Sequence, residues 1–257
     1  MLFGKNKSLV CFAPNDRAVA RLFCFPCAGA GASMYWRWAR LMPGVEVWAV
    51  NYPGREMLHG QTFASSVEVL LEPVLMQREL FSEKPFVVYG HSFGAVAAFS
   101  CALQLQEAGI RAQAVVSSAR RAPHLPAAHA ISGLPDDRLL VELDRFGGLP
   151  AAIRQDPEML ALYLPVIRAD LSLNEIIRIP DSSRIDSPLY VFAGTDDCSV
   201  SSTELAAWES RTRSSFEFIV MAGGHFFIHE PVEAFIAYLR NIVAISLQEP
   251  DEDVMAF

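Results

Sequence analysis

The sequence predicts an α/β fold in which a mostly parallel central sheet is covered by helices on both faces. Short apolar runs alternate along the chain with longer helical patterns, and near-continuous apolar runs are typical of strands buried on both sides. Because each helix carries the chain back across the sheet, this alternation predicts parallel neighbouring strands. A length of 257 residues fits one large α/β domain or two small ones, and we expect a single domain over residues 1–257.

Six segments rich in Val, Ile, Leu and Phe are predicted as strands. In chain order they are Arg21–Phe25, Val45–Val50, Pro85–Tyr89, Ala112–Ser118, Pro188–Gly194 and Ser215–Met221. The helical patterns between and after them are Met34–Met42, Ser65–Phe81, Phe93–Ala108, Ser201–Arg213 and Pro231–Ile245. Gly109 is expected to end the third helix, because glycine readily adopts the left-handed conformation found just past helix ends.

Residues 120–184 interrupt the alternation, because they contain no clear buried strand. They hold two amphipathic segments, residues 134–150 and 156–178, which are predicted as short helices separated by Gly147, Gly148 and prolines. We expect this insertion to form a helical lid over the edge of the sheet. Residues 247–257 are acidic and are expected to form a flexible tail.

The composition excludes several classes of function. A formal net charge of −8 argues against nucleic acid as a partner, because phosphate binding requires a basic face. No apolar run reaches the roughly 18 residues that span a bilayer, and Asn15, Asp16 and Arg17 interrupt the place where a secretory signal would be apolar. Five cysteines without an export signal predict reduced thiols, so we expect a cytoplasmic protein with no membrane partner.

No metal or cofactor is predicted. Cys24 and Cys27 form an isolated C-x-x-C pair, whereas a metal site would need a second pair or nearby histidines. Cys24 is instead expected to be a strand residue that points into the core. The small-residue segment Gly29-Ala30-Gly31 lacks the G-x-G-x-x-G spacing of a nucleotide-binding loop.

The segment Gly90-His91-Ser92-Phe93-Gly94 places one hydroxyl between two glycines, at the junction of a predicted strand and a predicted helix. It fits the G-x-S-x-G pattern of a nucleophile turn, which has meaning in this strand–turn–helix context. A sharp turn strains the serine backbone, and side chains on the flanking positions would collide with neighbouring chain. The pattern predicts that Ser92 is a nucleophile at the carboxyl edge of the sheet; a glycine-rich turn without chemistry is the alternative.

A serine hydroxyl is a poor nucleophile without a base and an acid, which follow this turn in the order Ser, Asp, His. Asp196 and Asp197 lie in the loop after a predicted strand, where the acid belongs. The acid commonly sits three residues past a glycine in such loops, and Asp197 has this spacing from Gly194. Asp197 is therefore the predicted acid, and Asp196 is the alternative, with a turn or helix cap as its other role.

His225 is the predicted base, because it lies just past the last predicted strand. The preceding Gly223-Gly224 pair allows the loop to swing the imidazole back towards Ser92. His229 competes for this role, but its place near a helix start favours a surface or capping function. His91 lies inside the turn itself, where its backbone directs it away from the hydroxyl.

The oxyanion of a tetrahedral intermediate requires two backbone donors. The N–H of Phe93 directly follows the nucleophile and is predicted to be one of them. The second should come from the loop after the first predicted strand, where small residues allow the backbone to approach a ligand closely. Ala28 is the predicted donor and Cys27 is the alternative.

These residues resemble a known family, the type II thioesterases of polyketide and nonribosomal peptide synthesis, which are α/β-hydrolases. The resemblance covers about residues 21–245. Cys27 departs from the His or Phe common in the family, and Cys198 departs from a frequent Pro. The similar segments are the opening at 22–43, the P-G-R turn at 50–56, the serine turn at 89–95, the lid runs at 134–150 and 164–175, and the loops at 194–200 and 223–228.

The resemblance implies hydrolysis of acyl groups from the phosphopantetheine arm of carrier proteins, which removes stalled or mis-primed units during antibiotic-type biosynthesis. It also implies a carrier-protein partner, and we expect the chain to be a monomer. Docking to the carrier should be weak, because carrier domains are acidic like this chain. A serine triad can form an acyl-enzyme with any ester or thioester. A serine esterase or lipase for small free esters, an acyltransferase and a non-catalytic carrier-binding module are therefore the alternatives.

Side chains of the predicted lid are candidates for lining an acyl pocket, with simple coverage of the core as the alternative. Two adjacent arginines, Arg120 and Arg121, could meet a carrier phosphate, but a solvated surface pair is the more ordinary expectation. The apolar lid candidates are Leu160, Leu162, Tyr163, Leu164, Ile167 and Leu171.

Overall fold

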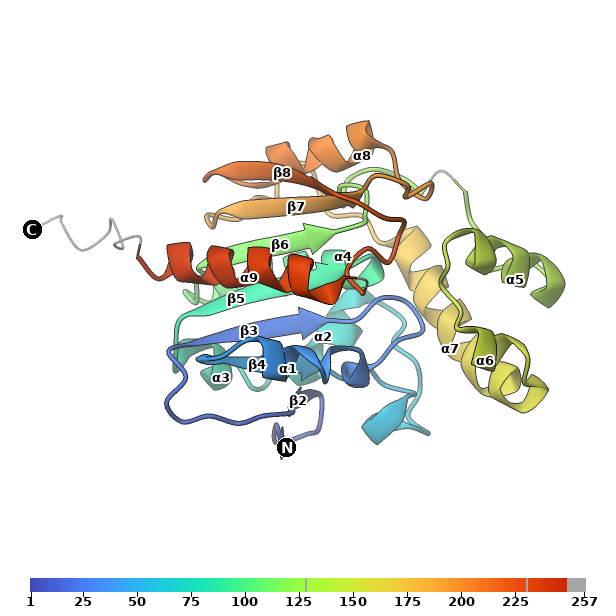
Figure 1. The fold of residues 1–257 in the computed structure, drawn as a ribbon, viewed down its shortest axis with the longest axis horizontal. Coiled ribbons are helices and arrows are strands. Elements are labelled where there is room, and N and C mark those ends of the chain that lie inside the picture. The colour runs from blue at the N-terminus through green and yellow to red at the C-terminus, as the bar shows by residue number, and fades with distance from the viewer. Residues whose placement is uncertain (128, 230, 249–257) are drawn as a thin grey trace, which may run out of the picture.

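The computed structural model describes residues 1–127, 129–229 and 231–248. Its centre is an eight-stranded sheet with the order β1-β2-β4-β3-β5-β6-β7-β8 (Figure 1). Strands β3 to β8 pair in parallel, whereas β1 and β2 are antiparallel at one edge, so the predicted mostly parallel sheet is confirmed. The strands are β1 Leu2–Phe3, β2 Leu9–Cys11, β3 Ala20–Phe25, β4 Val45–Val50, β5 Phe86–His91, β6 Ala114–Ser118, β7 Leu189–Gly194 and β8 Phe216–Met221.

All six predicted strands are present as β3 to β8, whereas the two short edge strands β1 and β2 were not predicted. β2 has only three residues, in which Val10 pairs with Ala49 of β4. Segments this short carry too few residues to establish a period. Cys24 lies fully buried in β3, as predicted.

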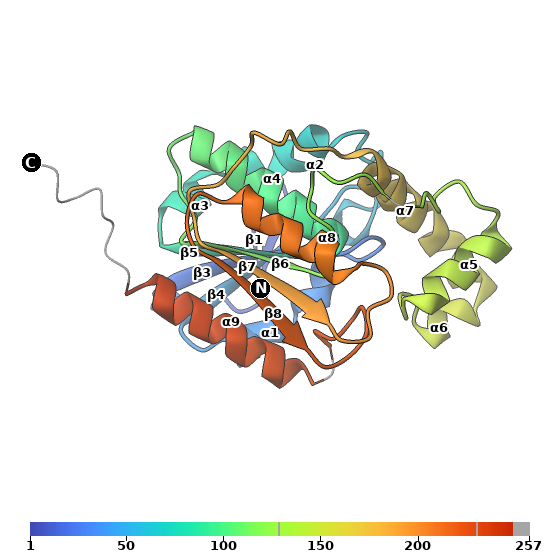
Figure 2. The same cartoon turned by 90° about the horizontal axis from the view of Figure 1, so that it is seen from above.

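Helices cover both faces of the sheet (Figure 2). α1 and α9 lie on one face, and α2, α3, α4 and α8 lie on the other. Each face of the sheet has one hydrophobic cluster between the strands and these helices. The helical elements are η1 Ala32–Tyr35, α1 Trp38–Leu41, η2 Glu56–Leu58, α2 Val67–Leu75, α3 Glu79–Ser82, α4 Phe93–Glu107, α5 Asp136–Arg145, α6 Ala151–Arg154, α7 Pro157–Ile176, α8 Ser202–Ala206, η3 Ala207–Arg211 and α9 Val232–Ser246.

The predicted helix at 65–81 is divided into α2 and α3 by a turn around Gln77. The Gln77 side chain is buried and donates hydrogen bonds to Asn6 Oδ1 and Ser8 Oγ, so the turn ties this segment to the chain near β2. The end of α4 follows the prediction, because Gly109 adopts a left-handed φ of 77° just past it.

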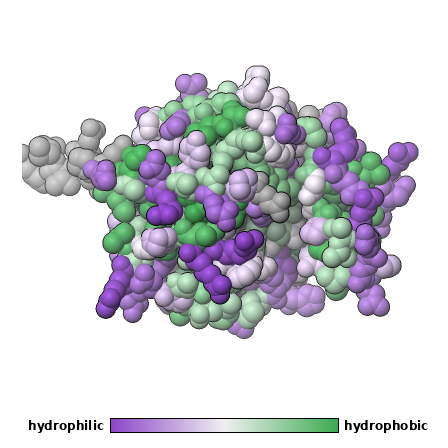
Figure 3. Space-filling view, viewed as in Figure 1, coloured by the Kyte–Doolittle hydropathy of each residue, from purple (hydrophilic) through white to green (hydrophobic). Residues whose placement is uncertain are grey.

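Between β6 and β7 the chain leaves the sheet and forms α5, α6 and α7 beyond the carboxyl ends of the strands (Figure 2). α7 has 20 residues, so this segment is one long helix where short helices were predicted. Asp156 caps its start by accepting the N–H groups of Glu158 and Met159. The insertion stands out from the body on one side, and its surface mixes hydrophilic and hydrophobic side chains (Figure 3).

Candidate active site

Ser92 occupies the sharp turn between β5 and α4. Its backbone has a φ of 53° and a ψ of −119°, which is a strained conformation for a residue with a side chain. A Cβ added to Gly90 would lie 2.0 Å from the carbonyl oxygen of Gly94, and one added to Gly94 would lie 2.0 Å from that of Phe25. Both glycines are therefore required by close backbone approach around the serine.

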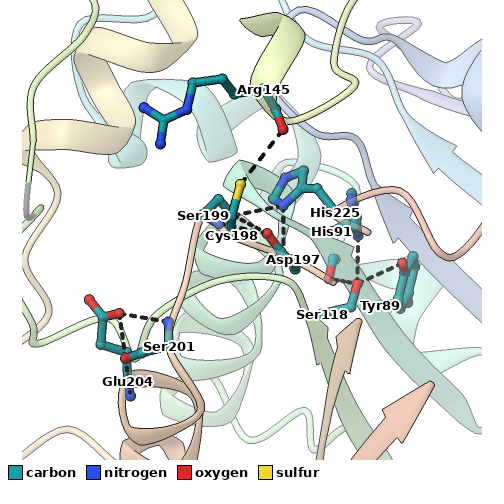
Figure 4. Close-up of polar contacts among 11 residues, drawn as sticks. Tyr89, His91, Ser118, Arg145, Asp197, Cys198, Ser199, Ser201, Glu204 and His225 are labelled. Carbon is teal, nitrogen blue, oxygen red and sulfur yellow. Dashed lines mark hydrogen bonds and ion pairs between the residues drawn. The ribbon is translucent and has the colours of Figure 1, made fainter. Parts of the chain in front are cut away.

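Asp197 and His225 meet at the carboxyl ends of β7 and β8 (Figure 4). The distance from His225 Nδ1 to Asp197 Oδ2 is 2.9 Å, and the two side chains are 9% and 2% exposed. Asp196, the alternative acid, is exposed, and its backbone N–H donates to the carbonyl oxygen of Gly223. Asp196 thus helps to hold the two loops together, while Asp197 faces the imidazole.

Ser199 is a residue of this site that the sequence did not reveal. Its hydroxyl and its backbone N–H both donate to Asp197 Oδ1, over 2.6 Å and 2.9 Å. The hydroxyl also lies 2.9 Å from His225 Nδ1 (Figure 4). A serine two residues after an aspartate is a common source of such local turns, so the spacing itself was an available signal.

The pKa of the Asp197 carboxyl lies below its ordinary value. Burial of the carboxyl acts to raise the pKa, but the hydrogen bond and the charge of His225, together with the bonds from Ser199, outweigh it. Asp197 is therefore a stable carboxylate that can orient an imidazole and stabilise its protonated form.

The other two histidines near the turn have different environments. His91 is fully buried, and its Nδ1 lies 2.8 Å from Ser118 Oγ, which places the ring on the side of β6 (Figure 4). Burial, with smaller effects from His225 and His229, lowers the pKa of His91 well below its ordinary value. His229 is exposed and stacks on Phe226.

The two expected oxyanion donors lie on neighbouring elements. Phe93 is the first residue of α4, where backbone N–H groups have no partner inside the helix. Ala28 lies in a turn in which the N–H of Ala30 donates to the carbonyl oxygen of Cys27, and Gly29 supplies a φ of 78°. β3 and β5 are adjacent in the sheet, so both residues lie at the same edge.

Ser92 and His225 line one cavity of about 240 Å³ under the helical insertion. Its apolar wall includes Phe146, Leu171 and Val200. Of the six lid candidates, Leu171 therefore faces this cavity. Leu164 and Ile167 are buried against Leu139 and Leu143 of α5, Leu160 and Tyr163 pack against that cluster, and Leu162 is 58% exposed.

Arg120 and Arg121 also line this cavity, and Arg120 is only 3% exposed. Both guanidinium groups donate to the carbonyl oxygen of Asn174, close to the end of α7. The expectation of a solvated surface pair is therefore wrong for Arg120. The reason is that the insertion folds back and brings the carboxyl end of α7 over the end of β6.

In the part of the chain that the structure describes, no helix has the length and apolar character needed to cross a membrane.

The parallel sheet, the strained serine turn and the Asp–His pair in the loops after later strands define an α/β-hydrolase. More specifically, the chain belongs to the thioesterase domain family, whose sequence profile matches residues 20–243. The resemblance to type II thioesterases is confirmed, and the chain is a thioesterase. The structure of the type II thioesterase BorB from the borrelidin biosynthetic cluster superposes with a TM-score of 0.81 at 31% identity, covering 91% of this chain and 96% of that one.

Two curated relatives match over nearly their whole length. The gramicidin S biosynthesis protein GrsT of Aneurinibacillus migulanus is 31% identical, covering 93% of this chain and 96% of the relative. Thioesterase PikA5 of Streptomyces venezuelae is 32% identical, and the match covers 95% of this chain and 88% of the relative. The probable cadicidin biosynthesis thioesterase of Streptomyces griseus is 33% identical, and this chain spans 62% of its length.

Proposed function

We propose that this thioesterase hydrolyses acyl groups from the phosphopantetheine arm of carrier proteins in polyketide or nonribosomal peptide synthesis, and so removes mis-primed or stalled units. The observation that carries the proposal is that Ser92 and His225 line one cavity, while Asp197 binds the Nδ1 side of the imidazole. The relatives named for antibiotic and peptide biosynthesis support the choice of pathway.

Acylation follows from this arrangement. With Nδ1 held by Asp197, Nε2 is the ring nitrogen left to take the proton from Ser92 Oγ. The oxygen attacks the thioester carbonyl, and the oxyanion binds to the N–H groups of Phe93 and Ala28. Collapse of the tetrahedral intermediate breaks the carbon–sulfur bond, and His225 returns the proton to the departing pantetheine thiolate.

Deacylation repeats the sequence with water as the nucleophile. His225 removes a proton from water, the hydroxide attacks the Ser92 ester, and the acid is released as His225 protonates Ser92 Oγ. Asp197 stabilises the imidazolium during both halves and stays ionised. An acyltransferase would differ only in the acceptor of the second half, so product analysis with an added amine or alcohol distinguishes the two.

The test uses intact mass spectrometry of acylated carrier proteins before and after incubation with the enzyme. We expect the wild-type protein to remove short acyl groups, and Ser92→Ala to lower the rate by about 10⁶-fold, which is the scale found when a triad serine is lost. A fluorophosphonate should label the wild-type protein and leave Ser92→Ala unlabelled. Faster turnover of simple aryl esters than of carrier thioesters would instead favour an esterase.

Several further features belong to the same proposal. The chain acts as a single-domain monomer in the cytoplasm, with residues 120–184 as a lid over the cavity. The position of α5 to α7 beyond the strand ends supports the lid role. The expected flexible tail lies outside the described residues from residue 249 onwards.

A further inference from the structure

A buried ion pair between Arg55 and Asp170 lies beside the loop that carries Ala28, and the reaction steps above do not use it. The side chains are 7% and 5% exposed. Asp170 belongs to α7 of the insertion, and Arg55 to the turn after β4, 115 residues away along the chain. Both Nη atoms of Arg55 donate to the carboxylate, with Nη2 2.7 Å from Oδ1, which is the bidentate contact that arginine makes with carboxylates.

The same pair binds the loop after β3 directly. Asp170 Oδ2 accepts the N–H of Gly29 over 2.8 Å. Arg55 Nη1 donates to the carbonyl oxygen of Ala30 over 3.1 Å. The two residues that follow Ala28 are therefore each held by one member of the ion pair.

The residue before this turn is held as well, through Tyr52. The Arg55 guanidinium lies 5.4 Å from the centre of the Tyr52 ring, and the Tyr52 hydroxyl donates to the carbonyl oxygen of Pro26 over 3.3 Å. The backbone on both sides of Ala28 is thus connected to Arg55.

Gly29 allows α7 to come this close. A Cβ at Gly29 would lie 2.5 Å from Cγ1 of Ile167, which precedes Asp170 by one helical turn. Gly29 is thus required twice, because a side chain would collide with α7 and because the turn needs a left-handed φ.

Stability alone is a weak reason for a pair of this kind. Removing two charges from water costs free energy that their attraction often fails to recover, and well-packed apolar residues commonly stabilise such positions equally well. Oxyanion donors, by contrast, act only when they are aimed at the place where the charge develops.

We propose that Asp170 and Arg55 are positioning residues that hold the N–H of Ala28 in the oxyanion hole, so that the hole depends on the placement of α7. The inference rests on the proposed function, because an oxyanion forms only when Ser92 attacks an acyl group. Their role is to hold the loop and not to contact the substrate.

The test is Asp170→Asn, which keeps the size and an acceptor for the N–H of Gly29 but removes the charge. We expect kcat to fall about 10- to 100-fold and KM to stay unchanged. This loss should not exceed the loss in kcat that follows removal of a whole oxyanion donor. A trifluoromethyl ketone analogue of acyl-pantetheine forms a tetrahedral adduct with Ser92, and its affinity should fall by the same factor. The affinity of the unreactive amide analogue should stay at the wild-type value.

Glu46→Gln is the matched control. Glu46 pairs with Arg21, and the two side chains are 5% and 8% exposed. The pair lies near the starts of β4 and β3, at the end of the strands opposite to Ser92. Glu46→Gln should lower Tm and leave kcat unchanged. Arg55→Lys, which keeps the charge but cannot form the fork, is measured beside Asp170→Asn as a second variant.

Wild-type adduct affinity in folded Asp170→Asn or Arg55→Lys would overturn the positioning role, and so would a kcat loss accompanied by an equal loss of amide affinity. A wild-type protein that releases no acyl group from any carrier would contradict the proposed function instead.

Discussion

Two buried pairs, Arg55–Asp170 and His225–Asp197, flank the serine and differ in what they can do. In both pairs an aspartate carboxylate contacts a nitrogen-containing side chain, a guanidinium in one and an imidazole in the other. All four side chains are at most 9% exposed. The first pair comes from the β4 turn and α7, on the β3 side of Ser92, and the second from the loops after β7 and β8, on the other side.

The difference lies in the proton. A guanidinium stays protonated and offers a rigid fork of donors, so it can hold a loop in place but cannot exchange a proton with the substrate. An imidazole can take up and release a proton, and His225 lines the cavity with Ser92 while its Nδ1 contacts Asp197. Burial of a charged pair therefore does not by itself mark a catalytic group.

The comparison is tested most severely by Asp197→Asn. The amide no longer stabilises the imidazolium and can bind the wrong tautomer, so we expect kcat to fall about 10³- to 10⁴-fold. Asp196→Asn, one residue away and exposed, should retain wild-type kcat. Equal losses in the two variants would show that the loop, and not the contact with His225, is what matters.

A smaller effect is expected for Ser199→Ala, which sharpens the comparison on the His225 side. The hydroxyl bond to the charged carboxylate is lost while the backbone N–H of Ser199 still binds Asp197 Oδ1. We expect kcat to fall about tenfold, which is the lower end of what a hydrogen bond to a charged group contributes, because the backbone N–H still holds the carboxylate.

Ser201→Ala is the control for this variant, because Ser201 caps α8 within the same loop and bonds Glu204. A rate for Ser199→Ala equal to that of Ser201→Ala would mean that the hydroxyl does not orient Asp197.

The smallest effect concerns His91, a buried base that belongs to neither pair, although its ring centre lies 5.1 Å from that of His225. Because the pKa of His91 is well below its ordinary value in the folded protein, the unfolded chain takes up a proton below about pH 6.5 and the folded one does not. The free energy of unfolding should be at its full value above that pH, and His91 should lower it by about 1.4 kcal/mol per pH unit as the pH falls.

Urea unfolding of wild type and His91→Asn between pH 5.0 and 7.5 measures this slope, with the difference between the two proteins isolating His91. Parallel pH profiles of stability would show that His91 does not contribute to the pH dependence.

Local sequence was sufficient wherever a feature is made by neighbouring residues. The six main strands, the serine turn with its glycines, and the positions of Asp197 and His225 just after strands all follow from periodicity and steric need within short segments. Asp197 was chosen over Asp196 by its spacing from Gly194, and Asp197 is the one that contacts His225. Ser199 could have been recognised in the same way.

Other features depend on contacts between distant segments. The P-G-R turn at 50–56 and the lid run at 164–175 were visible as separate motifs, but the contact between Arg55 and Asp170 could not be predicted from either. The lid candidates show the same limit, since the helical face was visible, while only the packing of α5 on α7 decided that Ile167 is covered and Leu171 lines the cavity.

The sequence by itself determined the class of fold, the strained serine turn and the types of side chain present in each loop, because backbone sterics and strand periodicity act between near neighbours. Only the tertiary structure decided which loops share the cavity and which charges are buried together. Those outcomes depend on how α7 folds back over the ends of β3 and β6, and that placement is set by the packing of side chains far apart in the chain.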